Sequence, residues 1–102
     1  MINIETTLPN KDTATKLANL LLKEKLCACI HLSPIESFYI WDSEIKNDDE
    51  FLLRIKTSKE MFQKLSATIT KHHPYEVPEI IATDIINIEE KYKNWLKTSL
   101  KS

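Results

Sequence analysis

Two prolines constrain the backbone of the segment HHPYEVPEI, residues 72–80. Proline fixes its own φ angle and disfavours helical geometry in the residue before it. Pro74 therefore ends the preceding helical pattern and extends His73, and Pro78 does the same to Val77. The polar side chains displayed by this stiff junction are those of His73, Tyr75, Glu76 and Glu79. Binding residues are concentrated on connections held by a rigid scaffold, so the segment is a candidate site.

Apolar residues recur at strand or helix spacing along the rest of the chain. The patterns predict strands over residues 2–8, 26–41, 51–57 and 77–88, and helices over 11–25, 58–72 and 90–100. Pro34 interrupts the second strand, which suggests a bulge or bend there. Residues 27–57 are predicted to form one long hairpin whose tip lies among the turn-forming residues 42–49.

This order of elements, βαββαβ followed by a last helix, predicts an α+β ferredoxin-like fold with two helices on one face of an antiparallel sheet. The length of 102 residues predicts a single domain over 1–102. The hairpin strands are longer than usual, and one sheet face has no helix to cover it. Self-association would cover both features, so we expect an oligomer.

The chain contains no glycine. Turns and helix ends must then use Asn, Asp, Ser or Pro. A phosphate-binding loop, a dinucleotide fingerprint, a nucleophile elbow and a calcium-binding EF-hand loop all require glycine, so these motifs are excluded. A nucleophilic pairing of Cys29 with His73 has no third orienting residue behind it. We therefore expect no enzyme and no organic cofactor.

The balance of charges argues against nucleic acid as a partner. Fourteen basic and fifteen acidic residues leave a net charge of −1, with no basic excess to offset phosphates. No apolar run approaches the roughly 20 residues that span a bilayer, and the N-terminal residues do not resemble a signal peptide. The sequence predicts a cytoplasmic protein without a membrane partner.

Cys27, Cys29 and His31 alternate along a predicted strand, so their side chains are expected on one face. Thiolates suit a soft ion such as Cu(I), although three ligands in a row cannot surround it. Two small core cysteines are the alternative, because free cysteine is among the most buried residue types.

His73 also has two interpretations. A nearby carboxylate, from Glu76 or Glu79, would fix its tautomer or share a metal ion with it. A purely structural histidine is the alternative. Adjacent His72 is interpreted as a cation at the helix C-terminus.

Several segments together resemble the CutA family of small divalent-cation tolerance proteins. They are LCACI at 26–30, SFYIW at 37–41, LRIKT at 53–57, HPYEVPEI at 73–80 and YKNWL at 92–96. The resemblance covers nearly the whole chain, and HPYEVPEI is its most specific part. Two departures stand out: His31 occupies a position that is often Asn in the family, and Trp41-Asp42-Ser43-Glu44 replaces a turn of the form W-x-G-K.

The resemblance implies a ferredoxin-like homotrimer whose sheets pack around a threefold axis, and an association with copper or other divalent metal ions without enzymatic activity. The metal ligands it suggests are Cys29, His73 and Glu76, with His31 as an added donor beside Cys29. The residues expected to line a cleft between subunits are His31, Trp41, Lys56, Tyr75 and Glu79. A PII-like signalling trimer that binds a small molecule in that cleft is the alternative, by analogy of fold alone.

Overall fold

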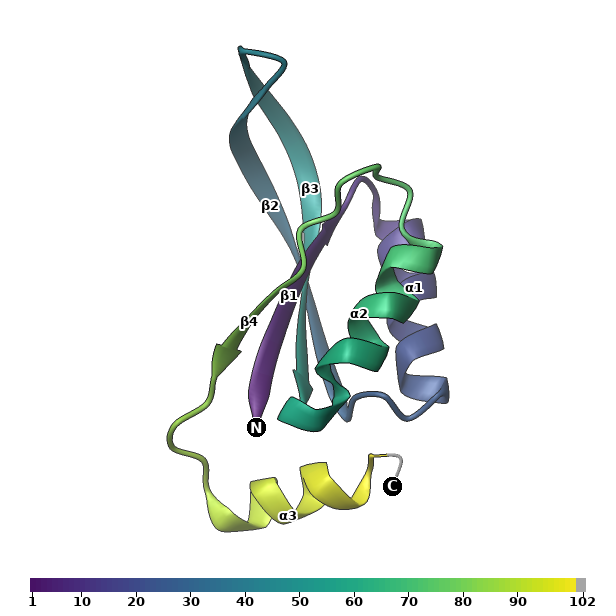
Figure 1. Ribbon diagram of the computed structural model, residues 1–102, viewed down its shortest axis with the longest axis vertical. Helices are drawn as coiled ribbons and strands as arrows, with labels where there is room; N and C mark the ends of the chain where they lie inside the picture. The colour runs from purple at the N-terminus through teal and green to yellow at the C-terminus, as the bar shows by residue number, and fades with distance from the viewer. Residues whose placement is uncertain (101–102) are drawn as a thin grey trace.

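The computed structural model describes residues 1–100. Its elements are β1 (Ile2–Leu8), α1 (Lys11–Lys23), β2 (Cys29–Trp41), β3 (Glu44–Thr57), α2 (Phe62–His72), β4 (Ile81–Asp84) and α3 (Glu90–Thr98), with a 3-10 turn at Lys59–Met61 before α2. The strands form one sheet in the order β2-β3-β1-β4 with antiparallel neighbours. Helices α1 and α2 cover one face of it (Figure 1). The predicted α+β ferredoxin-like architecture is confirmed.

The core lies between this sheet face and the two helices. In the pairing of β1 with β3, Ile4 is opposite Ile55 and Thr6 is opposite Leu53, so their side chains point to the same face. The helices meet this face with apolar residues at helical spacing, among them Leu17, Leu21, Leu65 and Ile69. All of these side chains are buried.

The β2-β3 hairpin extends well beyond the helices (Figure 1). Its register runs without interruption from Cys29 opposite Lys56 to Trp41 opposite Glu44. The predicted bulge at Pro34 is therefore wrong. The strand tolerates this proline because β2 lies at the sheet edge, where a missing N–H need not remove a ladder hydrogen bond.

Positive φ angles occur at three residues without the help of glycine. Asp42 and Ser43, with φ of 51° and 63°, form the two-residue hairpin turn, as expected from their side-chain types. Lys25, with φ of 57°, follows α1. There the Leu26 N–H donates to the Leu21 carbonyl, and the Lys25 N–H donates to the Leu22 carbonyl. This is a Schellman ending, usually made by glycine. Lysine was not among the residues expected at such a position.

Strand β4 is much shorter than the predicted 77–88. It pairs with β1 only from Glu5 opposite Ile81 to Ile2 opposite Asp84. Beyond Glu5 the carbonyl of Thr7 is hydrogen-bonded to the ring of His73 instead. The edge of β1 is thus shared between a short strand and a side chain, so the ladder begins only at Ile81. At the other end it stops where β1 begins, with Ile85 N–H donating to the Met1 carbonyl at 3.0 Å.

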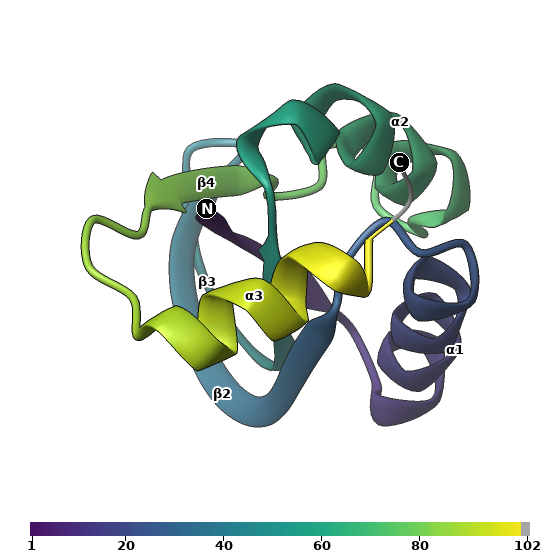
Figure 2. The ribbon, with the colours of Figure 1, turned by 90° about the horizontal axis from the view of Figure 1, so that it is seen from below.

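Helix α3 lies across the end of the sheet where β1 begins (Figure 2). Glu89 caps it, because its carboxylate accepts hydrogen bonds from the N–H groups of Lys91 and Tyr92, both at 2.9 Å. Leu96 is its fully buried anchor. No helix within residues 1–100 has the length and apolar character needed to cross a membrane.

Two buried threonines on neighbouring strands provide a matched test of core energetics. The Thr57 hydroxyl donates to the Leu26 carbonyl at 2.7 Å, whereas the Thr6 hydroxyl has no hydrogen-bond partner among residues 1–100. We expect Thr57→Val to lower the free energy of unfolding by about 1–3 kcal/mol, because it leaves a buried carbonyl unpaired. Thr6→Val should be neutral or stabilising, because it removes an unpaired hydroxyl.

Urea unfolding of both variants at equal protein concentration measures this difference. Equal losses of stability in the two variants would contradict the hydrogen-bond assignment.

Candidate functional site

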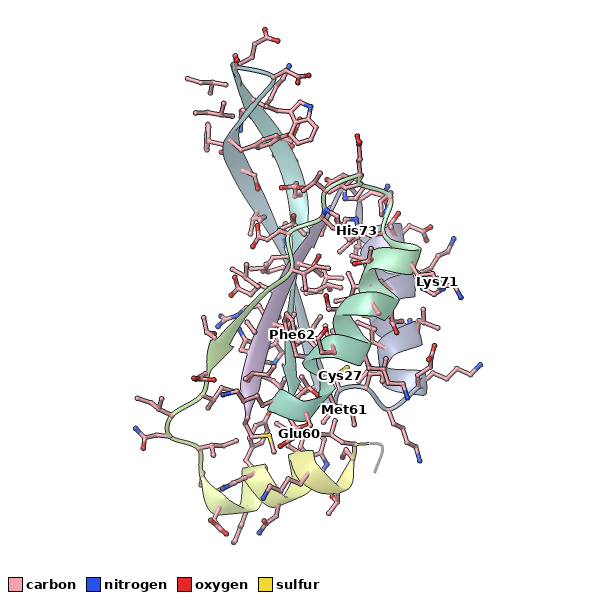
Figure 3. The ribbon with its side chains drawn as sticks, in the orientation of Figure 1. Cys27, Glu60, Met61, Phe62, Lys71 and His73 are labelled. Carbon is pink, nitrogen blue, oxygen red and sulfur yellow. The ribbon has the colours of Figure 1, made fainter. Side chains whose placement is uncertain are left out.

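His73 follows α2 and contacts the sheet near the C-terminal end of β1. Its backbone is extended, with φ of −86° and ψ of 137°, as expected before Pro74. The ring Nε2 lies 2.8 Å from the Thr7 carbonyl oxygen, and Nδ1 accepts the Tyr75 N–H at 3.1 Å. A carbonyl only accepts and an amide N–H only donates, so the proton resides on Nε2. Figure 3 shows His73 between the end of α2 and the sheet.

These contacts favour the structural interpretation of His73. Both ring nitrogens are engaged, so a metal ion would have to displace the Tyr75 N–H to reach Nδ1. Burial lowers the pKa of His73, while the Thr7 carbonyl opposes that shift to a smaller extent. The neutral ring is therefore the native form. Its tautomer is determined by a backbone carbonyl, and not by Glu76 or Glu79 as the sequence had suggested.

Tyr75 continues the same junction toward the hairpin. Its hydroxyl donates to Glu50 Oε2 at 2.6 Å, and its ring lies 4.9 Å from that of His73. Burial, followed by the hydrogen bond to the Glu50 carboxylate, raises the pKa of Tyr75. The Tyr75 hydroxyl therefore keeps its proton, and its hydrogen bond to Glu50 connects the junction to β3.

The junction and the hairpin enclose an open cleft of about 580 Å³. The side chains that define its chemistry are Tyr39, Trp41, Glu50, Tyr75, Glu76 and Glu79. Trp41, Tyr75 and Glu79, which were expected to line a cleft between subunits, line this cleft within one protomer. His31 and Lys56 do not. Sequence reasoning missed Tyr39 and Glu50, whose membership depends on where the junction crosses the hairpin.

The cleft has an acidic character. Burial, followed by the neighbouring Glu5 and Glu50 carboxylates, raises the pKa of Glu79. At the hairpin end, the Tyr39 hydroxyl is hydrogen-bonded to Asp48, and this bond is the main reason that the pKa of Tyr39 is raised. None of the described residues that line the cleft is Lys, Arg or His.

Cys29 lies elsewhere, at the opposite end of the sheet. Its Sγ is 3.7 Å from His31 Nε2, and it faces Lys56 of β3, whose Nζ donates to Asn3 Oδ1 at 3.1 Å. Burial of the phenol is the main reason that the pKa of Tyr92 is raised, and the adjacent Cys29 thiol adds to it. His31 and Lys56, the other two residues expected in a cleft, thus lie beside the Cys29 thiol.

Cys27 does not share the face of Cys29. It precedes β2 and belongs to the buried core, as Figure 3 shows beneath α2. Burial raises its pKa to about 12, so it is a neutral thiol. The expected alternation of Cys27, Cys29 and His31 on one face is therefore wrong, because the strand geometry begins only at Cys29.

The three suggested metal ligands do not converge within one protomer. Cys29 of β2 is opposite Lys56 of β3, and Lys56 is in turn opposite Asn3 of β1. His73 instead binds the carbonyl of Thr7, four residues further along β1. That separation is about 13 Å at the usual rise of a strand. Within the described chain, no group of three or more His, Cys, Asp or Glu side chains is arranged to hold a metal ion. A site that uses Cys29, His73 and Glu76 together thus requires more than one subunit.

The fold, the projecting hairpin and the histidine junction define a class of small α+β ferredoxin-like proteins. Residues 2–99 match the family model described as "CutA1 divalent ion tolerance protein". The chain belongs to this family.

Relatives share this assignment across distant organisms. The chain is 40% identical to "Protein CutA, chloroplastic" of Arabidopsis thaliana, over 99% of this chain and 56% of that protein. It is 38% identical to "Divalent-cation tolerance protein CutA" of Pyrococcus horikoshii, over 94% of each. The chain therefore spans only a little over half of the plant relative but nearly all of the archaeal one.

Solved structures agree with the fold. The crystal structure of CutA1 from Pyrococcus horikoshii has a TM-score of 0.97 and 36% identity, with full coverage of both chains. The structure titled "Periplasmic divalent cation tolerance protein CutA" from Archaeoglobus fulgidus has a TM-score of 0.96 and 31% identity, and it covers 99% of this chain and 100% of that one.

Stability should depend on pH through His73. The folded pKa lies below the ordinary value of 6.5, so the unfolded chain binds the proton first as the pH falls. The contribution of the neutral ring is complete above about pH 6.5 and is lost as the pH falls through the folded pKa. Urea unfolding between about pH 8 and about pH 5 should show this loss, and His73→Gln should reduce it. Identical pH profiles for parent and variant would contradict the assignment.

Proposed function

We propose that the protein is a homotrimeric divalent-cation tolerance protein that binds copper or another divalent metal ion and takes part in the response to metal ions. Membership of the CutA1 family, whose model covers residues 2–99, is the observation that carries this proposal. Its relatives are named as tolerance proteins and not as enzymes, which supports a binding role without catalysis.

The hairpin supports the trimer. Phe38, Ile40 and Ile45 are 69%, 75% and 82% exposed, and the register places all three on one face beyond the helices. Clustered exposed apolar residues are typical of an interaction surface. The outer edge of β2 is also unpaired within residues 1–100. A further copy of the chain would cover both features.

Replacing one of these residues by a charge should disrupt the assembly. We expect the parent protein to sediment as three chains and Ile40→Asp to sediment as a smaller species, because a carboxylate would be buried in the contact. Leu22→Asp is the matched control, since Leu22 is an exposed apolar residue on α1. A trimer that persists in Ile40→Asp, or a monomeric parent, would contradict this interface.

For the metal site we propose Cys29 as the sulfur ligand, with Glu76 and His73 supplied from a second subunit. His73 would bind through Nδ1, with the metal ion taking the place of the Tyr75 N–H. The contact of 3.7 Å between Cys29 Sγ and His31 Nε2 supports soft-metal binding at Cys29, because thiolate and imidazole both suit copper. His31 is the competing nitrogen ligand, since its ring nitrogen already lies beside the sulfur.

Copper(I) affinity, measured anaerobically against a chromophoric chelator, tests these ligands. The double variant Cys29→Ser with His73→Ala should lose at least about 100-fold in affinity, because loss of even a supporting hydrogen bond costs 10–100-fold. His31→Asn reveals which histidine contributes. Cys27→Ala is the control, as Cys27 lies in the core. Unchanged copper affinity in the double variant would overturn the site.

The cleft supports a second candidate function, a PII-like signalling trimer that binds a small molecule. A hollow of about 580 Å³ with Trp41 and Tyr75 in its lining is of a size and composition typical of ligand sites. Thermal stabilisation by a small molecule, but not by metal ions, would favour this alternative.

We also propose a cytoplasmic location, without a nucleic-acid or membrane partner. Cys27 and Cys29 are free thiols, which a reducing compartment preserves. The near-neutral charge supports the absence of a nucleic-acid partner. Cell fractionation against compartment markers tests the location.

A further inference from the structure

We propose that the cleft between the hairpin and residues 74–79 binds an alkylammonium ion, an organic cation whose charged nitrogen is attached to an apolar carbon chain. This inference goes beyond metal binding and does not depend on it. It deepens the small-molecule alternative by naming the chemical class of the ligand.

Charge is the first observation. Glu50, Glu76 and Glu79 line the cleft, and no described lining residue carries a positive charge. Walls of one charge sign focus the electrostatic field inside a cleft and raise the local concentration of oppositely charged ions. The cleft therefore selects cations and rejects anions.

Glu50 is the second observation. Only 7% of this residue is exposed, and the one side-chain hydrogen bond of its carboxylate within residues 1–100 comes from the Tyr75 hydroxyl. No Lys, Arg or His of the described chain forms an ion pair with it. A buried carboxylate without a counter-charge is costly, and a bound cation would offset that cost.

Aromatic side chains are the third observation. Tyr39, Trp41 and Tyr75 line the same cleft as the carboxylates. Aromatic ring faces attract cations, and tryptophan is the strongest of them in this respect. The rings also provide apolar surface for carbon atoms attached to the charged nitrogen. A ligand with both features matches this lining better than a hydrated inorganic ion.

The spacing of the carboxylates excludes a simple metal site here. A calcium ion requires 6–8 oxygen ligands at about 2.3–2.6 Å. Within residues 1–100, the acidic side chains do not converge in any such group. Carboxylates that line one cleft without converging on a point match a cation with an attached carbon chain, which favours an amine over a metal.

Fluorescence of Trp41 tests the proposal on the assembled protein. A Trp95→Phe background leaves Trp41 as the only tryptophan, because the chain has two. Titration with 1,4-diaminobutane should give a saturable change that weakens as salt is added. Neither 1,4-butanediol, which lacks the charge, nor succinate, which reverses it, should produce this change.

Two variants locate the binding. Glu50→Gln keeps an acceptor for the Tyr75 hydroxyl but removes the charge, and it should weaken binding by about tenfold or more. Glu76→Gln changes an exposed side chain, so it tests the cleft even if Glu50→Gln does not fold; it should weaken binding several-fold. Glu24→Gln, beyond the end of α1, is the matched control and should bind as the parent does.

The proposal is overturned if the parent gives no saturable change, as expected if a side chain of a second copy fills the cleft. Equal responses to 1,4-butanediol, or unchanged affinity in both Glu50→Gln and Glu76→Gln, would overturn it as well. None of these readouts involves copper, so the outcome is separate from that of the metal-binding proposal.

Discussion

The antiparallel pairing of β1 with β3 is the contact on which the rest of the molecule depends. It aligns seven residue pairs, from Ile2 opposite Thr57 to Leu8 opposite Phe51. One set of alternating side chains, including Ile4 and Ile55, is buried beneath the helices. The other set faces away, where Arg54 Nε lies 3.5 Å from Glu5 Oε2. A slip of one residue would bring these charges into the core, so the hydrophobic effect holds the register in place.

That register also determines where the two clusters of functional groups lie. The cluster around Cys29 lies where β1 begins, and the His73 junction lies where β1 ends. A single protomer therefore separates the soft thiol from the imidazole. It also places the imidazole in a structural role, between Thr7 and Tyr75. The junction at residues 72–80 resembles a binding motif in sequence, but in the structure its histidine connects a helix to a sheet. Carboxylates beside the junction line the cleft.

Much of the fold could be predicted from local patterns. Period-two and helical spacing predict the order of elements, and the turn-forming residues 42–49 predict the region of the hairpin tip, because these signals lie within a few neighbouring residues. The structure narrows the turn to Asp42-Ser43, since residues 44–49 continue β3. The predictions that are wrong depend on distant contacts. The fourth strand begins late because His73 occupies the edge of β1 at Thr7, and Cys27 leaves the strand pattern because it is buried in the core. For the site, the junction pointed to Tyr75 and Glu79 and the family resemblance pointed to Trp41, whereas Glu50 became visible only through its contact with Tyr75.

By itself, the sequence determined the family, the order of strands and helices, and the stiff proline-bounded junction, because each is written in residues that are close together along the chain. Only the tertiary structure decided which groups meet. It separated Cys29 from His73, engaged both nitrogens of the imidazole, and placed a buried, uncompensated Glu50 against aromatic rings. The physical reason is that side-chain chemistry depends on burial and on partners from distant segments, and both are set by the strand register and by the path of the junction across the sheet.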